Sequence, residues 1–584
     1  MHDIVIRGGT VIDGTGRNRF QADVAISKGR IVKVGQVSES GRREIDATGK
    51  LVTPGWVDVH THYDGQVSWD SYLSPSCWHG VTTVVMGNCG VGFAPVAPDY
   101  HDRLINIMEG VEDIPGTALA EGICWEWETF PEYLDFLDSR SYALDVATQI
   151  PHAAVRTYVM GDRGGANEPA TAEEIARMAD LVADGLAAGA FGFTTSRISA
   201  HRTADGDVVP GTQVGIDEME GICAALGKAP DAVFEVVSDL HLEVPGSLTA
   251  EEDLAWMGDL SRRYGVKFTF LMHRNPGNPE KWRHIMKLTD EQNGRGADLM
   301  PQISPRPIGI IMGWQSSFNI FMGRPTYDRI AKLPFVEQLR ELRRPEIRET
   351  IISEKSGKTP FEGIPLLPEL MFRLASEDGF LNYEPAYADS VRALAEARGV
   401  SADAIIYDML MENDGNGYVY VVIMNYADYN LEFVRELMAK ESVLLGGSDA
   451  GAHCGAICDA AIPTFMLSYW ARDREVGPRL SIEEVVAKQT SHTARGYGLH
   501  DRGVIAEGMR ADLNIIDYAR INCSVPSMLF DLPAGGRRLV QTATGYDATI
   551  VNGVVTFEGG VATGQLPGRL VRRRQHADAE VLAN

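Results

Sequence analysis

The alternation of apolar and polar residues divides the chain into three parts. At the start, stretches such as DIVIRGGTVID and ADVAISKGRIVKVG alternate between glycine-rich turns, a pattern typical of short antiparallel strands. The same texture returns near the end, in ATIVNGVVTFEGGVATG. Between these parts, apolar runs such as GVTTVVMG and VLLGG are separated by segments with helical periodicity. The sequence therefore predicts two β-rich ends around a long α/β region.

One helix of the α/β region is marked at both ends. In TAEEIARMADLVADGLAAGA, Thr171 is expected to cap the N-terminus, Glu174 completes a capping box, and Gly189 lies near the stop. Strands that alternate with such helices predict a parallel sheet, and their number favours a closed (β/α)8 barrel of the TIM type. The expected fold class is therefore α/β.

The predicted domains follow from these patterns of apolar and polar residues. Each β-rich end has only about 50 to 80 residues, which is marginal for an independent core, so one discontinuous β-sandwich built from both termini is expected. Residues 1–53 and 501–573 would form this sandwich, and residues 54–500 would form the barrel. The stretch within 275–440 is longer than one βα unit needs and is expected to carry an insertion over the barrel mouth. Residues 574–584 look like a frayed tail of mixed charge.

Composition narrows the classes of partner. The 584 residues carry a formal net charge of −26, which argues against nucleic acid and anionic membranes as partners. No apolar run approaches the length of a transmembrane helix, and the N-terminus lacks the pattern of a secretory signal. The seven cysteines are scattered without a CxxC motif, which favours a reducing compartment. We expect a cytoplasmic protein, either a monomer or a homo-oligomer.

The strongest chemical signal is PGWVDVHTHYDG, residues 54–65. Pro54 and Gly55 punctuate the entry to a short buried strand, and His60 and His62 stand two residues apart at its end. Residues two apart in a strand share a face, so the two imidazoles are placed side by side for one divalent metal. A lone pair of this kind is more often two unrelated surface histidines, but the turn, the strand and the pair together favour a metal site.

Other ligand-type residues follow the later strands. Cys89 lies in GNCG, where it is either a zinc-binding thiolate or a small buried apolar side chain. Asp449 lies in GGSDAGAH, where its carboxylate either contacts a metal and accepts a proton from water, or only forms a turn. His241 and His273 follow two further strands, and the sequence does not decide whether they bind the metal. A mixed set of imidazole, thiolate and carboxylate suits zinc better than magnesium.

Three residues are candidates for contacting a substrate. Arg197 and His201, in TTSRISAHR, belong to a cationic cluster that either clamps a carboxylate or makes solvated surface pairs. His453 lies four residues after Asp449 and either orients that carboxylate or meets the substrate.

The stretch PGWVDVHTHYDG resembles the first barrel strand of the amidohydrolase superfamily, metal-dependent hydrolases built on a (β/α)8 barrel. RGVIAEGMRADLNIID, residues 502–517, resembles the return of the chain from the barrel into the sandwich. The resemblance covers residues 1–573 and points to the N-acyl-D-amino-acid deacylase branch. The motifs around its fifth- and sixth-strand histidines differ from those usual in that branch. The resemblance implies Asp449 as the catalytic residue and the following metal ligands: His60, His62, Cys89, His241, His273 and Asp449.

The leading functional prediction is a zinc-dependent amidohydrolase, with one or two ions, that cleaves the amide bond of an N-acyl amino acid by metal-activated water. The substrate is a small molecule. Its amino acid has either the L or the D configuration, and the resemblance favours D. A cyclic amide hydrolase of the hydantoinase or dihydroorotase kind is the alternative, although no lysine stands at a strand end between residues 90 and 227. A non-catalytic scaffold of the same fold is a further alternative, but such proteins lose the HxH pair and the last-strand aspartate.

Overall fold

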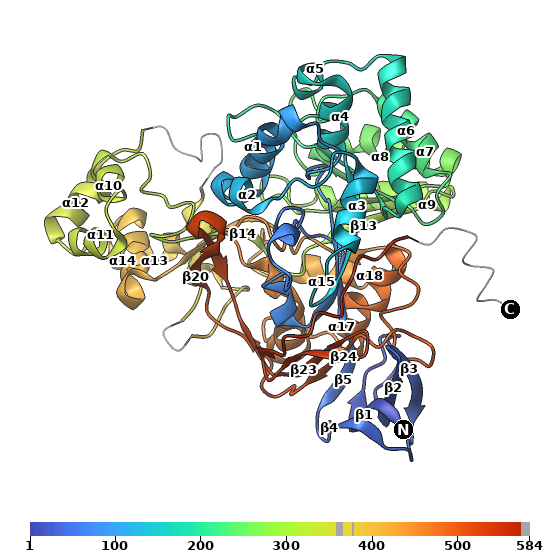
Figure 1. The fold of residues 1–584 in the computed structure, drawn as a ribbon. Helices are drawn as coiled ribbons and strands as arrows, with labels where there is room; N and C mark the ends of the chain where they lie inside the picture. Colours follow the sequence, from blue (N-terminus) through green and yellow to red (C-terminus); the bar gives the residue numbers. More distant parts are fainter. Residues whose placement is uncertain (358–365, 377–378, 574–584) are drawn as a thin grey trace.

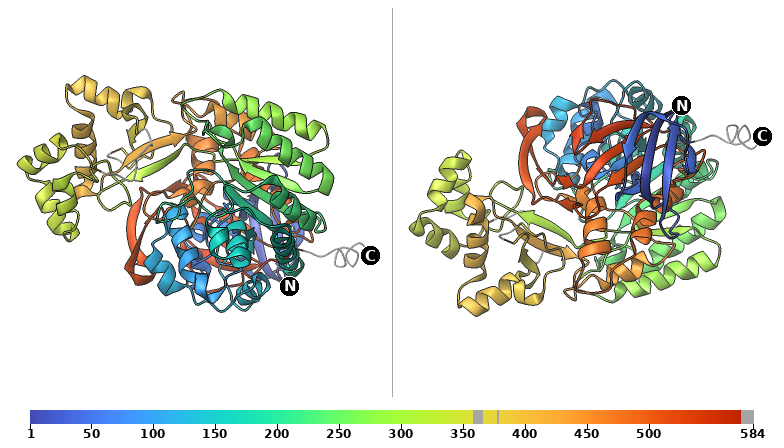
Figure 2. Two further views of the ribbon diagram at one scale, coloured as in Figure 1. Left: turned by 90° about the horizontal axis from the view of Figure 1, so that it is seen from above. Right: turned by 90° about the horizontal axis from the view of Figure 1, so that it is seen from below.

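The computed structural model describes residues 1–357, 366–376 and 379–573 (Figure 1). The predicted tail, residues 574–584, lies outside the described residues. Three bodies are visible: a β-sheet that holds the N-terminus, a larger body of parallel strands and helices, and a helical lobe that projects to one side (Figures 1 and 2). The sheet and the lobe lie on different sides of the larger body.

Both ends of the chain contribute to one nine-stranded sheet. The strand order is β25-β24-β23-β18-β5-β1-β2-β3, with β4 also paired to β1. β5 pairs antiparallel with β18, so the two ends of the chain meet inside the sheet. Apolar side chains at alternate positions, such as Ile4, Ile6 and Val24, are buried in a core of their own. The strands are β1 (His2–Val11), β2 (Phe20–Ser27), β3 (Arg30–Gly35), β4 (Gly41–Asp46), β5 (Leu51–Pro54), β18 (Leu513–Ile516), β23 (Tyr546–Val551), β24 (Val554–Glu558) and β25 (Val561–Ala562).

The larger body is built on parallel strands in two sheets, β6-β7-β8 and β17-β13-β12-β11-β10-β9. β8 and β9 are separated only by Gln149. An isolated parallel bridge between Thr61 and Ala450 links the chain beyond β6 to the chain beyond β17. All six residues of β7 are buried, as expected for a parallel strand covered on both faces. The strands are β6 (Trp56–Asp58), β7 (Val81–Met86), β8 (Asp145–Thr148), β9 (Ile150–Pro151), β10 (Gly192–Arg197), β11 (Val233–Ser238), β12 (Lys267–Leu271), β13 (Leu299–Ile303) and β17 (Leu444–Leu445).

Helices connect these strands, and α6 (Ala172–Ala188) has the caps that the sequence predicts. The Thr171 hydroxyl accepts from the backbone N–H of Glu174, whose carboxylate accepts from the N–H of Thr171, and Gly189 ends the helix at a φ of 118°. That prediction is confirmed. The other helices are α1 (His101–Glu112), α2 (Gly116–Gly122), α3 (Phe130–Asp138), α4 (His152–Met160), α5 (Asp162–Gly165), α7 (Ile216–Leu226), α8 (Ala250–Tyr264), α9 (Lys281–Gly294), α15 (Glu432–Met438), α16 (Ile462–Phe465), α17 (Ile482–Gln489) and α18 (Ser491–Gly496).

Between β13 and β17 the described residues of 308–424 form the helical lobe, around a separate apolar core that includes Trp314 and Tyr407. Its antiparallel sheet has the order β14-β16-β15. The stretch 275–440 also holds α9 and β13, which belong to the parallel body. The elements of the lobe are β14 (Ile308–Met312), α10 (Pro325–Ile330), α11 (Phe335–Leu342), α12 (Pro345–Ser353), β15 (Met371–Arg373), α13 (Val391–Arg398), α14 (Ala402–Gly415) and β16 (Val419–Met424).

A hairpin of β20 (Ser527–Leu532) and β21 (Gly536–Val540) runs beside the loop that follows β17. The backbone N–H of Leu539 donates to the carbonyl of Cys454, which ties the hairpin to that loop. Two short strands, β19 (Asn522–Cys523) and β22 (Ala543–Thr544), pair next to it. Within the described ranges, no helix has both the length and the apolar character that a membrane span requires.

Candidate metal centre

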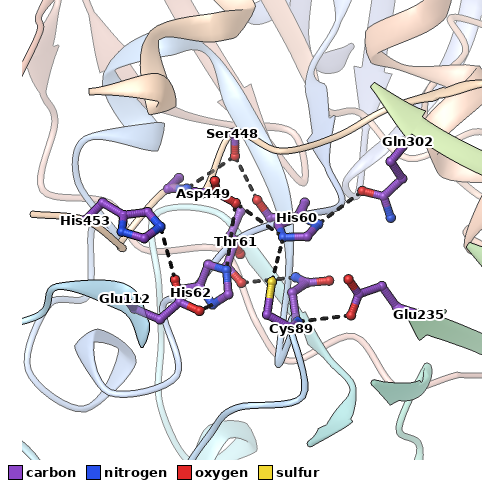
Figure 3. Close-up of polar contacts among 12 residues, drawn as sticks. His60, Thr61, His62, Cys89, Glu112, Glu235, Gln302, Ser448, Asp449 and His453 are labelled. Atoms are coloured by element: carbon purple, nitrogen blue, oxygen red, sulfur yellow. Dashed lines mark hydrogen bonds and ion pairs between the residues drawn. The ribbon is translucent and has the colours of Figure 1, made fainter. Parts of the chain in front are cut away.

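Two of the sequence-predicted ligands meet a third beyond the ends of β6 and β7. Side-chain donor atoms of His60, His62 and Cys89 all lie within 4.8 Å of one another, and all three residues are buried (Figure 3). The Cys89 Sγ is 3.3 Å from the His60 Nε2. Cys89 has a positive φ of 55°, so the GNCG turn bends back and carries the thiol toward the imidazoles. The adjacent Gly90 leaves room for this turn, because a Cβ there would collide with the backbone of β10.

Asp449 joins this cluster from the loop after β17. Its Oδ1 is 3.2 Å from the His60 Nε2 and 3.8 Å from the His62 Nε2. Asp449 also has a positive φ, of 45°, and the preceding Ser448 holds the turn. The Ser448 Oγ lies 2.9 Å from the His60 carbonyl oxygen (Figure 3). The same Oγ lies 2.6 Å from the Asp58 Oδ2. The first and last parallel strands are therefore joined by hydrogen bonds at this point.

Two buried glutamates that the sequence reasoning missed also face the cluster. The Glu112 carboxylate, at the end of α1, lies 3.5 Å from the His62 Nδ1 and 3.6 Å from the His453 Nε2. The Glu235 Oε2 accepts the backbone N–H of Cys89 at 3.0 Å. Glu235 could have been noticed in the sequence, because a charged residue inside the apolar run VFEVVS is unusual. No feature of the local sequence distinguishes Glu112.

His241 and His273 form a second pair beyond β11 and β12. Their rings are edge to face with centroids 4.7 Å apart. Both ring nitrogens of His241 and the Nδ1 of His273 are buried and without a hydrogen-bond partner. Within the residues that the structure describes, the only group of three or more donors close enough to share an ion is the first cluster. The structure thus brings these two histidines to each other but not into that cluster.

Burial sets the protonation of the cluster in the absence of metal. Burial lowers the pKa of His60 to about 4, so its imidazole is neutral near pH 7. Burial raises the pKa of Asp449 to about 6 and that of Glu235 to about 8. Burial also raises the pKa of the Cys89 thiol, and nearby carboxylates raise it further. In each case burial shifts the pKa in the direction that favours the neutral form.

A divalent cation fits this set of donors. Neutral imidazoles, thiolates and carboxylates are the protein ligands that zinc uses. Buried polar atoms in the cluster lack hydrogen-bond partners, including both ring nitrogens of His62 and one oxygen each of Glu112 and Glu235. Buried polar groups of native proteins are nearly always partnered. A cation would bind one ring nitrogen of each imidazole and offset the clustered carboxylates.

The three predicted substrate contacts lie in different places. His453 faces the cluster through Glu112, and the His201 Nδ1 lies 2.9 Å from the Ser196 Oγ. Burial lowers the pKa of His201 to about 3, and the charges of His453 and His60 lower it further. Arg197 follows Ser196 on β10, and successive residues of a strand point to opposite faces.

The contacts of Arg197 lead away from the cluster. Its guanidinium donates to the Val214 carbonyl at 3.0 Å and lies 5.8 Å from the ring centre of Trp256, a residue of α8. It lines a separate pocket of about 560 Å³ with Arg202 and Asp253. The structure therefore does not bring Arg197 together with the predicted ligands.

Comparison with known proteins places this geometry in a family. A sequence profile of the amidohydrolase family matches residues 43–306 and 372–557. D-aminoacylase from Alcaligenes xylosoxydans xylosoxydans is 27% identical over 576 residues, which cover 98% of this chain and 98% of the relative.

Two solved structures share the fold. A crystal structure of D-aminoacylase is 23% identical, with a TM-score of 0.64 over 98% of this chain and 100% of that one. N-acyl-D-glutamate deacylase from Bordetella bronchiseptica, complexed with zinc and a phosphonate inhibitor, is 22% identical, with a TM-score of 0.63 over 98% of this chain and 99% of that one. Because the family profile matches more than half of its residues, the chain belongs to the amidohydrolase family.

Proposed function

We propose that the protein is a zinc-dependent amidohydrolase that cleaves the amide bond of N-acyl amino acids, with the D configuration as its first choice. The observation that carries this proposal is the buried group of His60, His62 and Cys89 with Asp449 beside it, 3.2 Å from the His60 Nε2. Imidazole and thiolate together favour zinc over magnesium or calcium. The family match and the resemblance to D-aminoacylase support amide hydrolysis.

The proposal includes a closed (β/α)8 barrel as the scaffold of the site. The parallel strands reduce to eight when β8 and β9, one residue apart, are counted as one strand. The bridge between Thr61 and Ala450 supports closure between the first and last of them. The ligands would then lie at the C-terminal ends of the strands, where barrels of this type hold their active sites. We assign residues 1–53 and 501–573 to the accompanying β-domain.

The proposed ligands divide into two groups, which accommodates one or two ions. The first group is described above, and His241 with His273 forms the second, in which both ring nitrogens of His241 and the Nδ1 of His273 lack hydrogen-bond partners. Zinc in such a site supplies Lewis acidity, which polarises a carbonyl and makes a water molecule more acidic. The proposed ligands are His60, His62, Cys89, His241, His273 and Asp449.

The chain's own residues would move the proton. The Asp449 carboxylate accepts a proton from the attacking water, and the same carboxyl then gives that proton to the leaving amine nitrogen. Ser448 and Asp58 hold the backbone on which Asp449 stands. We assign to His201 and His453 the contacts with substrate at the rim of the cluster. Since Arg197 lies on the other side of β10, the proposal gives it no contact with substrate.

Metal analysis combined with a substrate screen tests this function. The protein is purified without added metal, and elemental analysis is expected to find about one or two equivalents of zinc. N-acyl-D-amino acids, their L counterparts and hydantoins are then offered to the same preparation. Preferred release of the amino acid from N-acyl-D substrates supports the proposal, and ring opening of hydantoins alone supports a cyclic amide hydrolase. A metal-free protein with no turnover of any substrate rejects it.

A further inference from the structure

We propose that Gln302 is a positioning residue that fixes the tautomer of His60, so that the lone pair of its Nε2 faces the metal cluster. This inference rests on the proposed metal site. Gln302 is a residue of β13, far from His60 in the sequence, and its side chain is fully buried. It has no atom placed to contact substrate in the proposed chemistry, so its role is exerted through His60.

The two nitrogens of His60 face different partners. Its Nδ1 lies 3.1 Å from the Gln302 Oε1, whereas its Nε2 lies 3.3 Å from the Cys89 Sγ and 3.2 Å from the Asp449 Oδ1 (Figure 3). A neutral imidazole carries one N–H and one lone pair. A carbonyl oxygen can only accept, so Gln302 requires the N–H on Nδ1. The lone pair is thereby left on Nε2, where a metal would need it.

The amide of Gln302 is itself held from two sides. Its Nε2 lies 3.0 Å from the Thr269 Oγ1 and 3.1 Å from the Tyr497 hydroxyl oxygen. Thr269 belongs to β12 and Tyr497 follows α18, and both are fully buried. Reversing the amide would turn its NH₂ group toward His60 and force the imidazole proton onto Nε2. In the observed orientation both hydroxyls accept from the amide NH₂ group while the Oε1 faces the His60 Nδ1, so all three contacts are satisfied together.

The backbone next to the amide leaves room for this arrangement. Gly446, just beyond β17, faces Gln302, and a Cβ at that position would collide with the Gln302 Oε1. His62 has no hydrogen bond of this kind: its Nδ1 lies 3.5 Å from the Glu112 Oε1, and neither of its ring nitrogens has a hydrogen-bond partner. The contacts are therefore specific to one of the two histidines rather than general to a polar interior.

Nitrogen NMR of the metal-free protein tests the tautomer directly. With selectively ¹⁵N-labelled histidine, the ring signals of His60 are assigned by their absence from His60→Asn. The wild type is expected to carry the proton on Nδ1. Gln302→Leu should give a mixture of tautomers, while Gln302→Glu, which still accepts from Nδ1, should keep the wild-type state. A proton on Nε2 in the wild type, or an unchanged tautomer in Gln302→Leu, would overturn the inference even if the protein is a zinc hydrolase.

Zinc affinity gives a second readout, measured by chelator competition. Loss of a group that orients a metal-bound histidine typically lowers affinity by about 10- to 100-fold, and that loss is expected for Gln302→Leu. Gln302→Glu should bind zinc at least as well as the wild type, because the Thr269 and Tyr497 hydroxyls can turn to donate to its carboxylate.

Thr269→Val provides the matched control away from His60. It removes one partner of the Gln302 amide but leaves the accepting oxygen, so its loss of zinc affinity should be smaller than that of Gln302→Leu. If Gln302→Leu does not fold, the wild type and Gln302→Glu decide the question: a wild-type proton on Nε2, or a Gln302→Glu tautomer that differs from the wild type, would overturn the inference. Graded loss across the variants would support it.

Discussion

At the scale of single residues, the proposed chemistry depends most on Asp449. Replacing it with Asn keeps the shape of the side chain, so the turn after Ser448 should survive, but the amide cannot accept a proton. General acid–base catalysis by one such group contributes roughly 10²- to 10⁴-fold in rate, so kcat of Asp449→Asn should fall by at least that much. Steady-state kinetics on the preferred N-acyl amino acid measures the loss.

The control for Asp449→Asn is its far-ultraviolet circular dichroism and melting curve, which should match the wild type. A folded, zinc-containing variant that keeps kcat within about tenfold of the wild type would assign the proton transfer to another group. His453, which shares the Glu112 carboxylate with His62, would then be the next residue to replace.

Two of the buried cysteines, Cys89 and Cys223, offer a matched comparison. Cys89 lies among the predicted ligands, 3.3 Å from the His60 Nε2, whereas Cys223 is buried in the apolar side of α7. Cys89→Ala should lose zinc and activity together, and Cys223→Ala should keep both. Elemental analysis after dialysis and kcat/KM report the two properties. Full zinc content and rate in Cys89→Ala would show that the thiol only packs.

The sequence indicated which residues could bind a metal, but it predicted only in part which of them lie together. His60, His62 and Cys89 were predictable because each follows a recognisable strand, and strand ends meet at one edge of a parallel sheet. Glu112 could not be predicted, since it reaches the cluster from the end of a helix. Arg197 also follows a strand, but the alternation of side chains along β10 turns it away from the cluster.

At the scale of elements, the features that could be predicted were those determined by residues close together in the sequence, such as the ends of helices. α6 begins and ends where its capping residues indicate, because a cap satisfies backbone groups within a few residues of itself. The approach of His241 to His273 is different in kind. The two rings meet because β11 and β12 are neighbours in the sheet. No local sequence pattern shows which strands pair or in which register.

Two helices, α4 and α7, are joined by a buried charge cluster that predicts a pH-dependent stability. Glu218 on α7 accepts from His152 at 2.7 Å and pairs with Arg156, both on α4. Burial acts to raise the pKa of Glu218, but the hydrogen bonds and charges of His152 and Arg156 outweigh it and hold this pKa at about 2. A lowered pKa means that the pair stabilises the fold above the pKa of an unfolded glutamate and loses that effect as the pH falls toward 2.

Glu218→Gln tests this link by melting experiments across pH. Near pH 7 the variant should melt well below the wild type, because the buried Arg156 loses its counter-charge. The gap in melting temperature should narrow as the pH falls below about 4.5. A gap that stays constant from neutral to acid pH would show that the charge of Glu218 does not contribute to holding the two helices.

At the scale of the whole molecule, the shared terminal sheet follows from the small size of each β-rich end. Neither end could bury a sufficient core alone, and the structure joins them through the pairing of β5 with β18. The size of the helical lobe was visible as an excess of residues between two strands. Its packing around Trp314 and Tyr407 was not, because helical periodicity indicates a buried face without showing which element covers it.

The stability of the whole protein should depend on the charge of its metal site. In the metal-free protein, burial raises the pKa of Asp58 to about 7 and that of Glu235 to about 8. A carboxyl with a raised pKa stabilises the fold fully below its unfolded pKa and loses that effect as the pH rises toward its folded pKa. The buried histidines respond in the opposite direction, so a comparison between variants is needed to isolate one carboxyl.

Glu235→Gln makes that comparison, because its amide oxygen still accepts the N–H of Cys89 and its charge is lost. Without metal, the variant and the wild type should melt together near pH 4.5, and the variant should melt a few degrees higher near pH 8. With zinc bound, the ionised Glu235 has a cation nearby, so the advantage of the variant should disappear. Melting curves with a chelator and with excess zinc measure both states. If the metal-free variant is less stable than the wild type at pH 8, then Glu235 is ionised and compensated within the protein itself, without help from a cation.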